Sequence, residues 1–541
     1  MAPSRFLLGV VVAAASISGA GGQAPTFAVA LAGWNAVVVD ARPVNAGGVL
    51  LESFISYSIE LAFFPDFAGN LSSPNAFSNT LLENIKEFSG TKPYIRVGGN
   101  TQDYAIYDPS LEVATEGIVD PAKSPDYPTT LSIGPSFFES YSTWPDTKFI
   151  HGFNLGRNST AARESLIASV PLACKALSGG KLLYWELGNE PDLFKTSSQG
   201  PVRPSNWTEA DYVAEWNSVT ADIRAAMQKS NPDFASSSNF KWIAPSFGGV
   251  GNSLKAVPTW QDGLDTSGSI ALFSSHNYIA GATQPGITLQ GTLLNHTATT
   301  ISVAKHNLEA RNLTGAGMRL PYILGETNSL YNQGAPGLSN SFGAALWNVD
   351  FALYCAATGI ARVHMHMGTD YRYAAWQPLT TVKTQIGTKP PYYGNVAVAA
   401  ALGDLTRGRG VRVGSLPLGD GVTAAGYAVY DGEVLVRVMV VDLKGWNYTI
   451  GTHPPRPETV YAFKLPTGCK GVGVVQRLMA NGSDAVEAVT FNGRSYDYER
   501  EKGRPVVIGG VARDEVVWVG EDGGVSVVLP WSSAALVQLS C

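Results

Sequence analysis

Two acidic residues of this chain each follow a short apolar run of the kind that forms buried β-strands. Glu190 comes after the run at 182–187, between Asn189 and Pro191, and Glu326 comes directly after the run at 322–325. A carboxyl group just past the C-terminal end of a barrel strand points into the usual active-site mouth of that fold. Two such groups can cleave a glycosidic bond, since one protonates the leaving oxygen and the other attacks or stabilises the anomeric carbon.

The elements that would position these carboxyl groups are short apolar runs that alternate with longer helix-like segments. Eight runs occur, at 55–60, 93–98, 149–154, 182–187, 242–245, 272–276, 322–324 and 362–366. Eight strand–helix units over about 340 residues are typical of a (β/α)8 barrel with long loops. Most runs end in a polar or acidic cluster, which an open doubly wound sheet would not explain. We therefore predict an α/β fold with a catalytic TIM barrel over 51–392.

Beyond the barrel the pattern changes. The segments 422–441 and 506–539 alternate around glycine-rich turns, which predicts a C-terminal antiparallel β-sandwich over 393–541. The N-terminal segment 25–50 contains the apolar stretch 36–40, which we expect to join this β-domain rather than the barrel. Two domains also agree with a length of 541 residues, because single hydrophobic cores rarely organise so many.

Composition and the first residues indicate where the protein works and what it does not bind. The chain is 45% apolar and carries a net charge of −6, which indicates a globular protein and argues against a nucleic-acid partner. Arg5, an apolar run at 6–17 and small residues after it predict a signal peptide at 1–24 and a secreted, extracellular protein. That run is shorter than the roughly 20 residues of a membrane span, and no membrane partner is expected.

Covalent features agree with export. Asn-x-Ser/Thr motifs predict N-glycans at several of Asn70, Asn158, Asn206, Asn295, Asn312, Asn447 and Asn481. The four cysteines allow three pairings; we favour Cys469 with Cys541, because both fall in the C-terminal region. Cys174 and Cys355 are interpreted as buried thiols. No CxxC or HExxH pattern occurs, so no metal site is predicted.

The residues around the two carboxyl groups indicate separate roles for them. Asn189 offers an amide that could bind a sugar 2-hydroxyl, and Glu186 should face the barrel interior near the acid, paired to a basic side chain. An attacking carboxylate must stay ionised and needs hydrogen-bond donors. His276, Asn277 and Tyr278 on the sixth run are candidate donors, although His276 is read equally well as a satisfied core histidine.

Four stretches carry a resemblance to a known family. The stretch 185–191, Trp-Glu-Leu-Gly-Asn-Glu-Pro, together with Glu326 resembles the retaining glycosidases of the large (β/α)8 clan. The stretch 94–104 looks like the second-strand motif of heparanases, and 325–331 with 334–336 looks like their nucleophile loop. From about residue 60 to 393 the chain resembles glycoside hydrolase family 79, the β-glucuronidase and heparanase family.

The resemblance implies a role for each matching position. Glu190 would be the general acid/base and Glu326 the nucleophile, and no cofactor would be needed. The implied substrate-binding residues are Glu60, Asn100, Asn189, Tyr278, Tyr331, Gln333, Gly334 and Tyr373. Among these, Asn189 would bind the 2-hydroxyl and Tyr278 would donate to the nucleophile. Tyr331, the backbone around Asn332, Gln333 and Gly334, and a tyrosine after the eighth run, with Tyr373 preferred over Tyr371, would clamp a uronic carboxylate.

Two departures separate the chain from heparanases: no Lys/Arg-rich run lies beside the candidate cleft, and the loop at 331–334 lacks their run of glycines. We predict a secreted retaining exo-β-glucuronidase that hydrolyses terminal β-glucuronic acid, with 4-O-methylation left open. The expected substrate is a glucuronide-bearing oligosaccharide, proteoglycan or plant polysaccharide. The alternatives are a heparanase-like endo-glucuronidase, an arabinofuranosidase or endo-glucanase of the same clan, or a non-catalytic secreted carbohydrate-binding protein. Two intact carboxyl groups argue against the last alternative.

Overall fold

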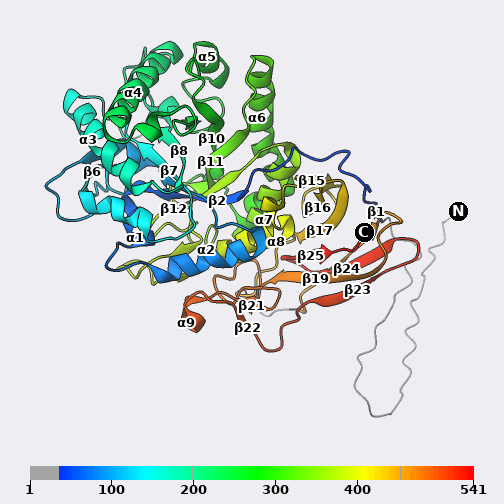
Figure 1. Ribbon diagram of the computed structural model, residues 1–541. Helices are drawn as coiled ribbons and strands as arrows, with labels where there is room; N and C mark the ends of the chain where they lie inside the picture. The colour runs from blue at the N-terminus through cyan, green and yellow to red at the C-terminus, as the bar shows by residue number, and fades with distance from the viewer. Residues whose placement is uncertain (1–35, 198, 451–453) are drawn as a thin grey trace, which may run out of the picture. The chain divides into compact units, whose positions relative to one another are not determined.

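The computed structural model describes residues 36–197, 199–450 and 454–541 (Figure 1). The predicted signal peptide at 1–24, and the predicted N-terminal segment as far as residue 35, lie outside the described residues. Within the described chain, eight parallel strands close into a barrel, and a β-rich region follows it. The predicted fold class, a TIM barrel with a C-terminal β-sandwich, is confirmed.

Each barrel strand overlaps one of the eight apolar runs, although β10 and β11 continue well beyond theirs. They are β2 (Ile55–Glu60), β3 (Ile95–Gly98), β7 (Phe149–Phe153), β8 (Leu182–Leu187), β9 (Trp242–Phe247), β10 (Ile270–Gly281), β11 (Tyr322–Tyr331) and β12 (Val363–Met367). Almost every residue of these strands is buried, because helices cover the outer face of a parallel barrel and side chains fill its interior. A small apolar cluster of Ile150, Ile243, Leu272 and Ile323 shares that interior with the polar residues of the site.

The outer helices are α2 (Ala76–Ser89), α3 (Thr160–Ala176), α4 (Glu209–Ser230), α5 (Ala256–Gln261), α6 (His296–Gly315), α7 (Phe342–Thr358) and α8 (Pro390–Leu402). The residues of α7 and α8 are buried on almost every side, since these helices also contact strands of the β-rich region. The predicted domain boundary at 392/393 falls inside α8. Prolines 390 and 391 occupy the first helical turn, where proline starts a helix rather than breaking it.

The β-rich region is a sandwich of two sheets. The larger sheet has the order β15-β16-β17-β25-β19-β20-β21-β22, with β23 also paired to β19, and the smaller has the order β1-β18-β24. Its strands are β1 (Val37–Val38), β15 (Val411–Leu416), β16 (Ala424–Asp431), β17 (Val434–Asp442), β18 (Glu458–Lys464), β19 (Gly471–Met479), β20 (Thr490–Phe491), β21 (Arg494–Ser495), β22 (Val506–Val507), β23 (Glu515–Val519), β24 (Gly524–Pro530) and β25 (Ser533–Gln538). One apolar cluster draws side chains from both sheets. The N-terminal strand β1 runs parallel to β18 in the smaller sheet.

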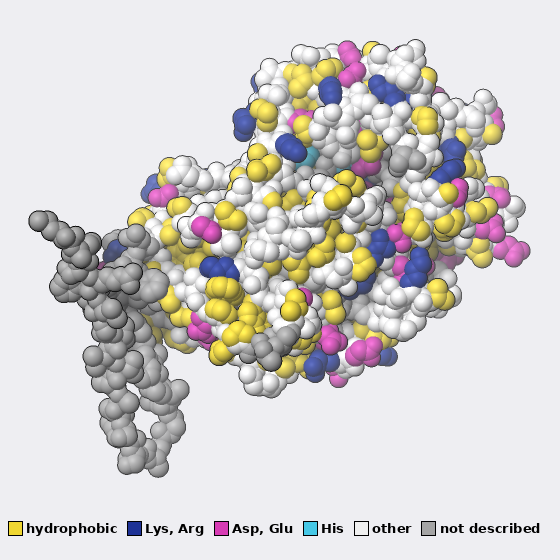
Figure 2. Space-filling view, turned by 180° about the vertical axis from the view of Figure 1, so that it is seen from behind, with side chains coloured by type: hydrophobic (Ala, Val, Ile, Leu, Met, Phe, Trp, Pro, Cys, Tyr) yellow, Lys and Arg dark blue, Asp and Glu magenta, His cyan; other side chains and the backbone are white. Residues whose placement is uncertain are grey.

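The structure also shows the states of the cysteines, the exposure of the predicted glycosylation sites and the distribution of charge on the surface. The Cys469–Cys541 disulfide is confirmed, and Cys174 and Cys355 are buried free thiols. Six of the asparagines in glycosylation motifs are exposed, whereas Asn295 is half-buried and caps α6; glycosylation itself stays a prediction. No helix among the described residues is long and apolar enough to span a membrane. On the described surface seen in Figure 2, lysine and arginine side chains stand scattered among acidic and neutral ones.

A small three-stranded sheet is inserted between β3 and β7. Its strands are β4 (Ala105–Tyr107), β5 (Thr115–Ile118) and β6 (Thr130–Ile133). The loop between β5 and β6 brings Lys123 and Tyr127 to a cavity at the barrel mouth. The sequence did not predict this insertion, because the region is rich in proline, serine and threonine and has little periodicity.

Candidate active site

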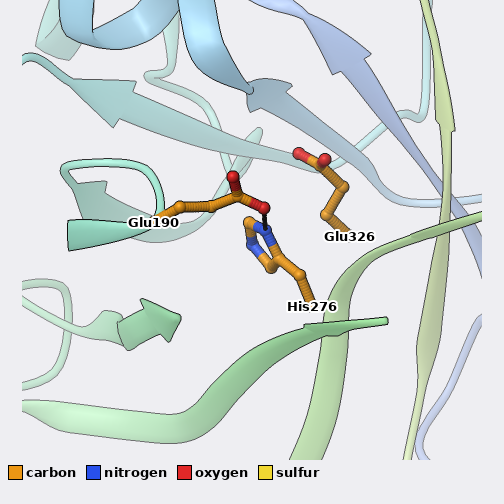
Figure 3. A group of neighbouring side chains, drawn as sticks. All are labelled: Glu190, His276 and Glu326. Carbon is orange, nitrogen blue, oxygen red and sulfur yellow. Dashed lines mark hydrogen bonds and ion pairs between the residues drawn. The ribbon is translucent and has the colours of Figure 1, made fainter. Parts of the chain in front are cut away.

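A cavity of about 770 Å³ opens at the C-terminal ends of the barrel strands and contains both predicted catalytic carboxyl groups. Glu190 follows β8 and Glu326 lies on β11. Figure 3 shows their carboxyl groups facing the same space beside His276. One oxygen of each carboxyl group and one nitrogen of His276 lie within 4.8 Å of one another. The structure therefore brings the two predicted residues together across one cleft.

The backbone at the end of β8 gives Glu190 its direction. Its φ of 52° and ψ of 50° are left-handed, a conformation that costs energy for a residue with a Cβ atom. The Glu190 N–H donates to the carbonyl oxygen of Ser246 at 3.0 Å. Gly248 packs on the carboxyl group, since a Cβ atom there would lie 3.0 Å from the Glu190 Cδ atom. These contacts hold the carboxyl group at the cavity wall.

Arg96 on β3 forms ion pairs with both Glu186 and Glu326. This role was not predicted from the sequence. Its Nε donates to Glu186 at 2.8 Å, its Nη1 to Glu326 Oε2 at 2.6 Å and its Nη2 to Asn189 Oδ1 at 2.8 Å. The guanidinium is fully buried, and a buried charge needs such partners. The predicted basic partner of Glu186 is therefore Arg96. The signal was present in the sequence as one arginine inside an otherwise apolar strand.

The two carboxyl groups have opposite electrostatic environments. Burial and then the charge of Glu326 raise the pKa of Glu190 to about 8. Burial would also raise the pKa of Glu326, but the nearby His366 and the charge of Arg96 outweigh it and hold that pKa below its usual range. The Tyr278 hydroxyl donates to Glu326 Oε1 at 2.7 Å, as predicted. A protonated carboxyl group beside an ionised one is the arrangement of an acid and a nucleophile.

The three candidate donors on β10 have different surroundings. A register shift between Ser275 and His276 places His276 opposite Glu326 on the neighbouring strand. The His276 Nδ1 atom lies 2.9 Å from Glu190 Oε1, and burial lowers the pKa of His276 to about 4, so the ring is neutral at neutral pH. Asn277 is wrong as a donor to the nucleophile, because its side-chain oxygen accepts from residues of α6 instead.

Asn189 and Asn100 both line the cavity. Asn189 Nδ2 donates to Asn100 Oδ1 at 3.2 Å. The carboxylate of Asp103 accepts the Asn189 N–H at 2.8 Å and also accepts two N–H groups from the loop after β7. The predicted amide for the 2-hydroxyl is thus held from both its backbone and its side chain.

The loop after β11 contributes Tyr331, Asn332 and Gln333 to the cavity, together with Tyr373 from the loop after β12. Gly334 is wrong as a backbone donor, because its N–H donates to the Leu330 carbonyl oxygen at 3.1 Å. Asn332 and Gln333 have φ angles of 61° and 60°, so they adopt the left-handed conformation that a run of glycines would otherwise provide. The N–H groups available at this wall are theirs.

Two further predicted residues differ in whether they line the cavity. Tyr371 does not line the cavity, and its hydroxyl donates to Glu60 at 3.2 Å, so Tyr373 is the tyrosine that faces the cavity. Glu60 itself is buried outside the cavity lining, and it accepts hydrogen bonds from the backbone and hydroxyl of Thr101. The prediction that Glu60 contacts the substrate therefore stays a prediction, and its described hydrogen bonds are to Thr101 and Tyr371.

Lys123, Arg157, Tyr104 and Tyr127 also line the cavity. Lys123 and Tyr127 lie in the loop between β5 and β6, Arg157 in the loop after β7 and Tyr104 at the end of the 3-10 helix Asn100–Tyr104. No local sequence pattern indicated that these side chains face the cavity. Among the described residues, Glu190, His276 and Glu326 are also the group whose atoms lie close enough to hold a metal ion. Glu326 is already ion-paired with Arg96, and the prediction of a metal-free site stays a prediction.

Comparisons with known proteins agree with this geometry. Residues 426–536 match the family described as "Glycosyl hydrolase family 79 C-terminal beta domain". A protein named β-glucuronidase from Aspergillus niger is 56% identical over 507 residues, covering 92% of each chain. A second protein of that name, from Neurospora crassa, is 50% identical over 540 residues, covering 93% of this chain and 97% of the relative.

Solved structures show the same fold. A 4-O-α-L-rhamnosyl-β-D-glucuronidase from Fusarium oxysporum 12S superposes with a TM-score of 0.73 at 25% identity, covering 93% of this chain and 99% of that one. A family 51 α-L-arabinofuranosidase from Bifidobacterium longum has a TM-score of 0.56 at 13% identity, covering 93% of this chain and 99% of that one. The second likeness concerns the fold alone.

Proposed function

This chain belongs to glycoside hydrolase family 79, and we propose that this β-glucuronidase removes terminal β-linked glucuronic acid with retention of the anomeric configuration. The observation that carries the proposal is the separation of the two carboxyl groups, whose oxygens lie within 4.8 Å of each other. Retaining glycosidases hold their carboxyl groups about 5–5.5 Å apart, whereas inverting enzymes leave about 6.5–9.5 Å for a water molecule.

The surroundings of each carboxyl group support its role. Glu190, whose pKa is raised to about 8, protonates the leaving oxygen while the ionised Glu326 attacks the anomeric carbon. Arg96 and Tyr278 hold the Glu326 carboxylate in its ionised form and fix both of its oxygens. After the leaving group departs, Glu190 takes a proton from water, which then releases the sugar from Glu326.

The proposed sugar is identified by a carboxylate at C6. Tyr331, Asn332, Gln333 and Tyr373 line the cavity, and the two hydroxyl groups and the backbone N–H groups of Asn332 and Gln333 are the proposed donors to this carboxylate. Neutral donors of this kind bind a carboxylate without a full counter-charge. The names of the two fungal relatives support the same sugar. Exo action and secretion through a signal peptide at 1–24 are parts of the proposal, and acceptance of a 4-O-methyl group is left open.

The test compares kcat/KM on matched aryl β-glucuronide, aryl β-glucoside and aryl arabinofuranoside, in the wild type and in Tyr331→Phe. Loss of two charge-assisted contacts should cost about 3–5 kcal/mol, or roughly a few hundred- to a few thousand-fold in kcat/KM, for the glucoside. In Tyr331→Phe the ratio of kcat/KM for glucuronide to kcat/KM for glucoside should become smaller, mainly because kcat/KM for the glucuronide falls. Similar rates on the first two sugars would refute the glucuronidase proposal. Proton NMR of the first-formed glucuronic acid should show the β-anomer, and the α-anomer would refute retention.

A further inference from the structure

Arg372 holds the loop after β11 from outside the cavity. Its backbone N–H donates to the Gln333 carbonyl oxygen at 2.9 Å. Its side chain donates from Nε to Gly334 O at 3.0 Å and from Nη2 to Asn332 O at 3.1 Å. One residue therefore fixes three successive carbonyl groups of the loop, while Arg372 itself is not among the residues that line the cavity.

These contacts determine where the loop's N–H groups point. In a trans peptide the C=O and N–H bonds lie on opposite sides, so the Asn332 carbonyl held by Arg372 turns the Gln333 N–H the other way. The Tyr331 carbonyl accepts from the Ala282 N–H at 3.0 Å and sets the Asn332 N–H in the same manner. Neither of these two N–H groups has an acceptor within the described parts of the chain. Successive N–H groups in such a turn form a concavity that binds anions.

The Arg372 guanidinium is itself held by Asp126. Nη1 and Nη2 donate to the two Asp126 oxygens, each at 2.9 Å. The Asp126 side chain is only 10% exposed, and a bidentate pair of this kind fixes a guanidinium in one orientation. Asp126 lies on the loop between β5 and β6, next to Tyr127 in the cavity wall. The ion pair thus joins two walls of the cavity.

We propose that Arg372 is a positioning residue that aims the backbone N–H groups of Asn332 and Gln333 at the C6 carboxylate of the substrate, with Asp126 holding its guanidinium in place. This inference rests on the proposed function. It adds a specificity determinant that touches no substrate atom and acts through the loop. Because a hydroxymethyl group accepts weaker hydrogen bonds than a carboxylate, the loss of Arg372 should affect glucuronides selectively.

The experiment compares the wild type with Arg372→Gln, Arg372→Lys and Asp126→Asn. The matched control is Arg163→Gln, which breaks another Arg–Asp pair, with Asp222 at 2.8 Å, away from the cavity. The measurements are KM and kcat on aryl β-glucuronide and β-glucoside, the inhibition constant of free glucuronate, and Tm. Arg372→Gln should raise the glucuronide KM and the glucuronate inhibition constant by about tenfold or more. Its kcat/KM on the glucoside should change by less than about twofold.

The other variants sharpen the outcome. Arg372→Lys keeps one donor and should recover part of the glucuronate affinity, Asp126→Asn should fall between it and the wild type, and Arg163→Gln should match the wild type. An equal loss on both sugars accompanied by a lower Tm would overturn the inference in favour of a purely structural role. If Arg372→Gln does not fold, an unchanged glucuronate inhibition constant in both remaining variants would overturn it as well. A wild type without preference for glucuronide would instead refute the proposed function itself.

Discussion

Replacing Glu190 with glutamine removes the proposed proton donor while keeping the shape of the side chain. In the wild type, burial and the charge of Glu326 raise the pKa of Glu190 to about 8. Glu190 is therefore protonated below that pH, and kcat/KM should fall as the pH rises through about 8. Since the pKa of Glu326 lies below its usual range, the acidic limb should lie well below neutrality. Glu190→Gln should abolish the basic limb.

The size of the loss depends on the leaving group. General acid catalysis contributes about 10²–10⁴-fold, and a leaving group of low pKa needs little of it. On an alkyl or unactivated aryl glucuronide, Glu190→Gln should lower kcat/KM by about 10³-fold, or roughly 4 kcal/mol of transition-state stabilisation. On a dinitrophenyl glucuronide the loss should stay within about tenfold. Glu326→Gln should abolish turnover of every substrate, because no glycosyl-enzyme can form.

The assay is a kcat/KM profile from about pH 4 to 10 on both substrates. Glu309→Gln is the control, because the pKa of Glu309 is also raised by burial but this side chain lies outside the cavity; it should keep the basic limb. Azide should partly restore Glu190→Ala on the activated substrate and give a β-glycosyl azide. Equal losses on both leaving groups, without azide rescue and with the basic limb still present, would refute the acid/base assignment.

Two further outcomes are expected. Tyr278→Phe removes a 2.7 Å hydrogen bond to Glu326, worth about 1.5–3 kcal/mol at a charged acceptor. It should therefore move the acidic limb of the pH profile up by about 1–2 units, whereas Tyr212→Phe, whose buried hydroxyl has no partner among the described residues, should leave that limb in place. The protonated His296 donates from Nδ1 to Asp350 Oδ1 at 2.8 Å, and although burial opposes it, this contact raises the pKa of His296 above 6.5. The stability that this ion pair contributes should be complete below pH 6.5 and lost as the pH rises through the raised pKa. The free energy of unfolding in urea, measured against pH, should therefore show this loss in the wild type and not in His296→Gln. The same pH dependence in both proteins would contradict this expectation.

The sequence predicted the barrel and its two carboxyl groups because both depend on local patterns. A strand buried on both faces is apolar along its length, and acidic residues toward its C-terminal end face the barrel mouth. This pattern identified Glu190, which follows β8, and Glu326, which lies within β11 rather than after it because that strand runs on to Tyr331. The role of Arg96 depends instead on partners 90 and 230 positions away, and a single sequence gives no measure of such distances.

The orientation of the Gly334 peptide and of the Glu60 side chain could not be read from the sequence either. The resemblance implied a clamp from the backbone of Asn332, Gln333 and Gly334, but the Gly334 N–H closes the turn onto Leu330 and only the N–H groups of Asn332 and Gln333 are left for it. Glu60 was placed in the cavity from its position at the end of β2, but its side chain points to Thr101 and Tyr371. Which way a strand-end side chain or a peptide plane turns is decided by neighbours from other elements.

The position of β25 affects how a newly made chain reaches this structure. β25 lies between β17 and β19 in the larger sheet, although both of those strands precede it in sequence. During synthesis the ribosome releases β17 and β19 with unpaired edges, which invite pairing with other chains. Residues 533–538 must be made before the two halves of the sheet can join, and α7 and α8 pack against that sheet. Translation that stops short of β25 should therefore yield aggregation-prone chains, even though every residue of the barrel has already been made.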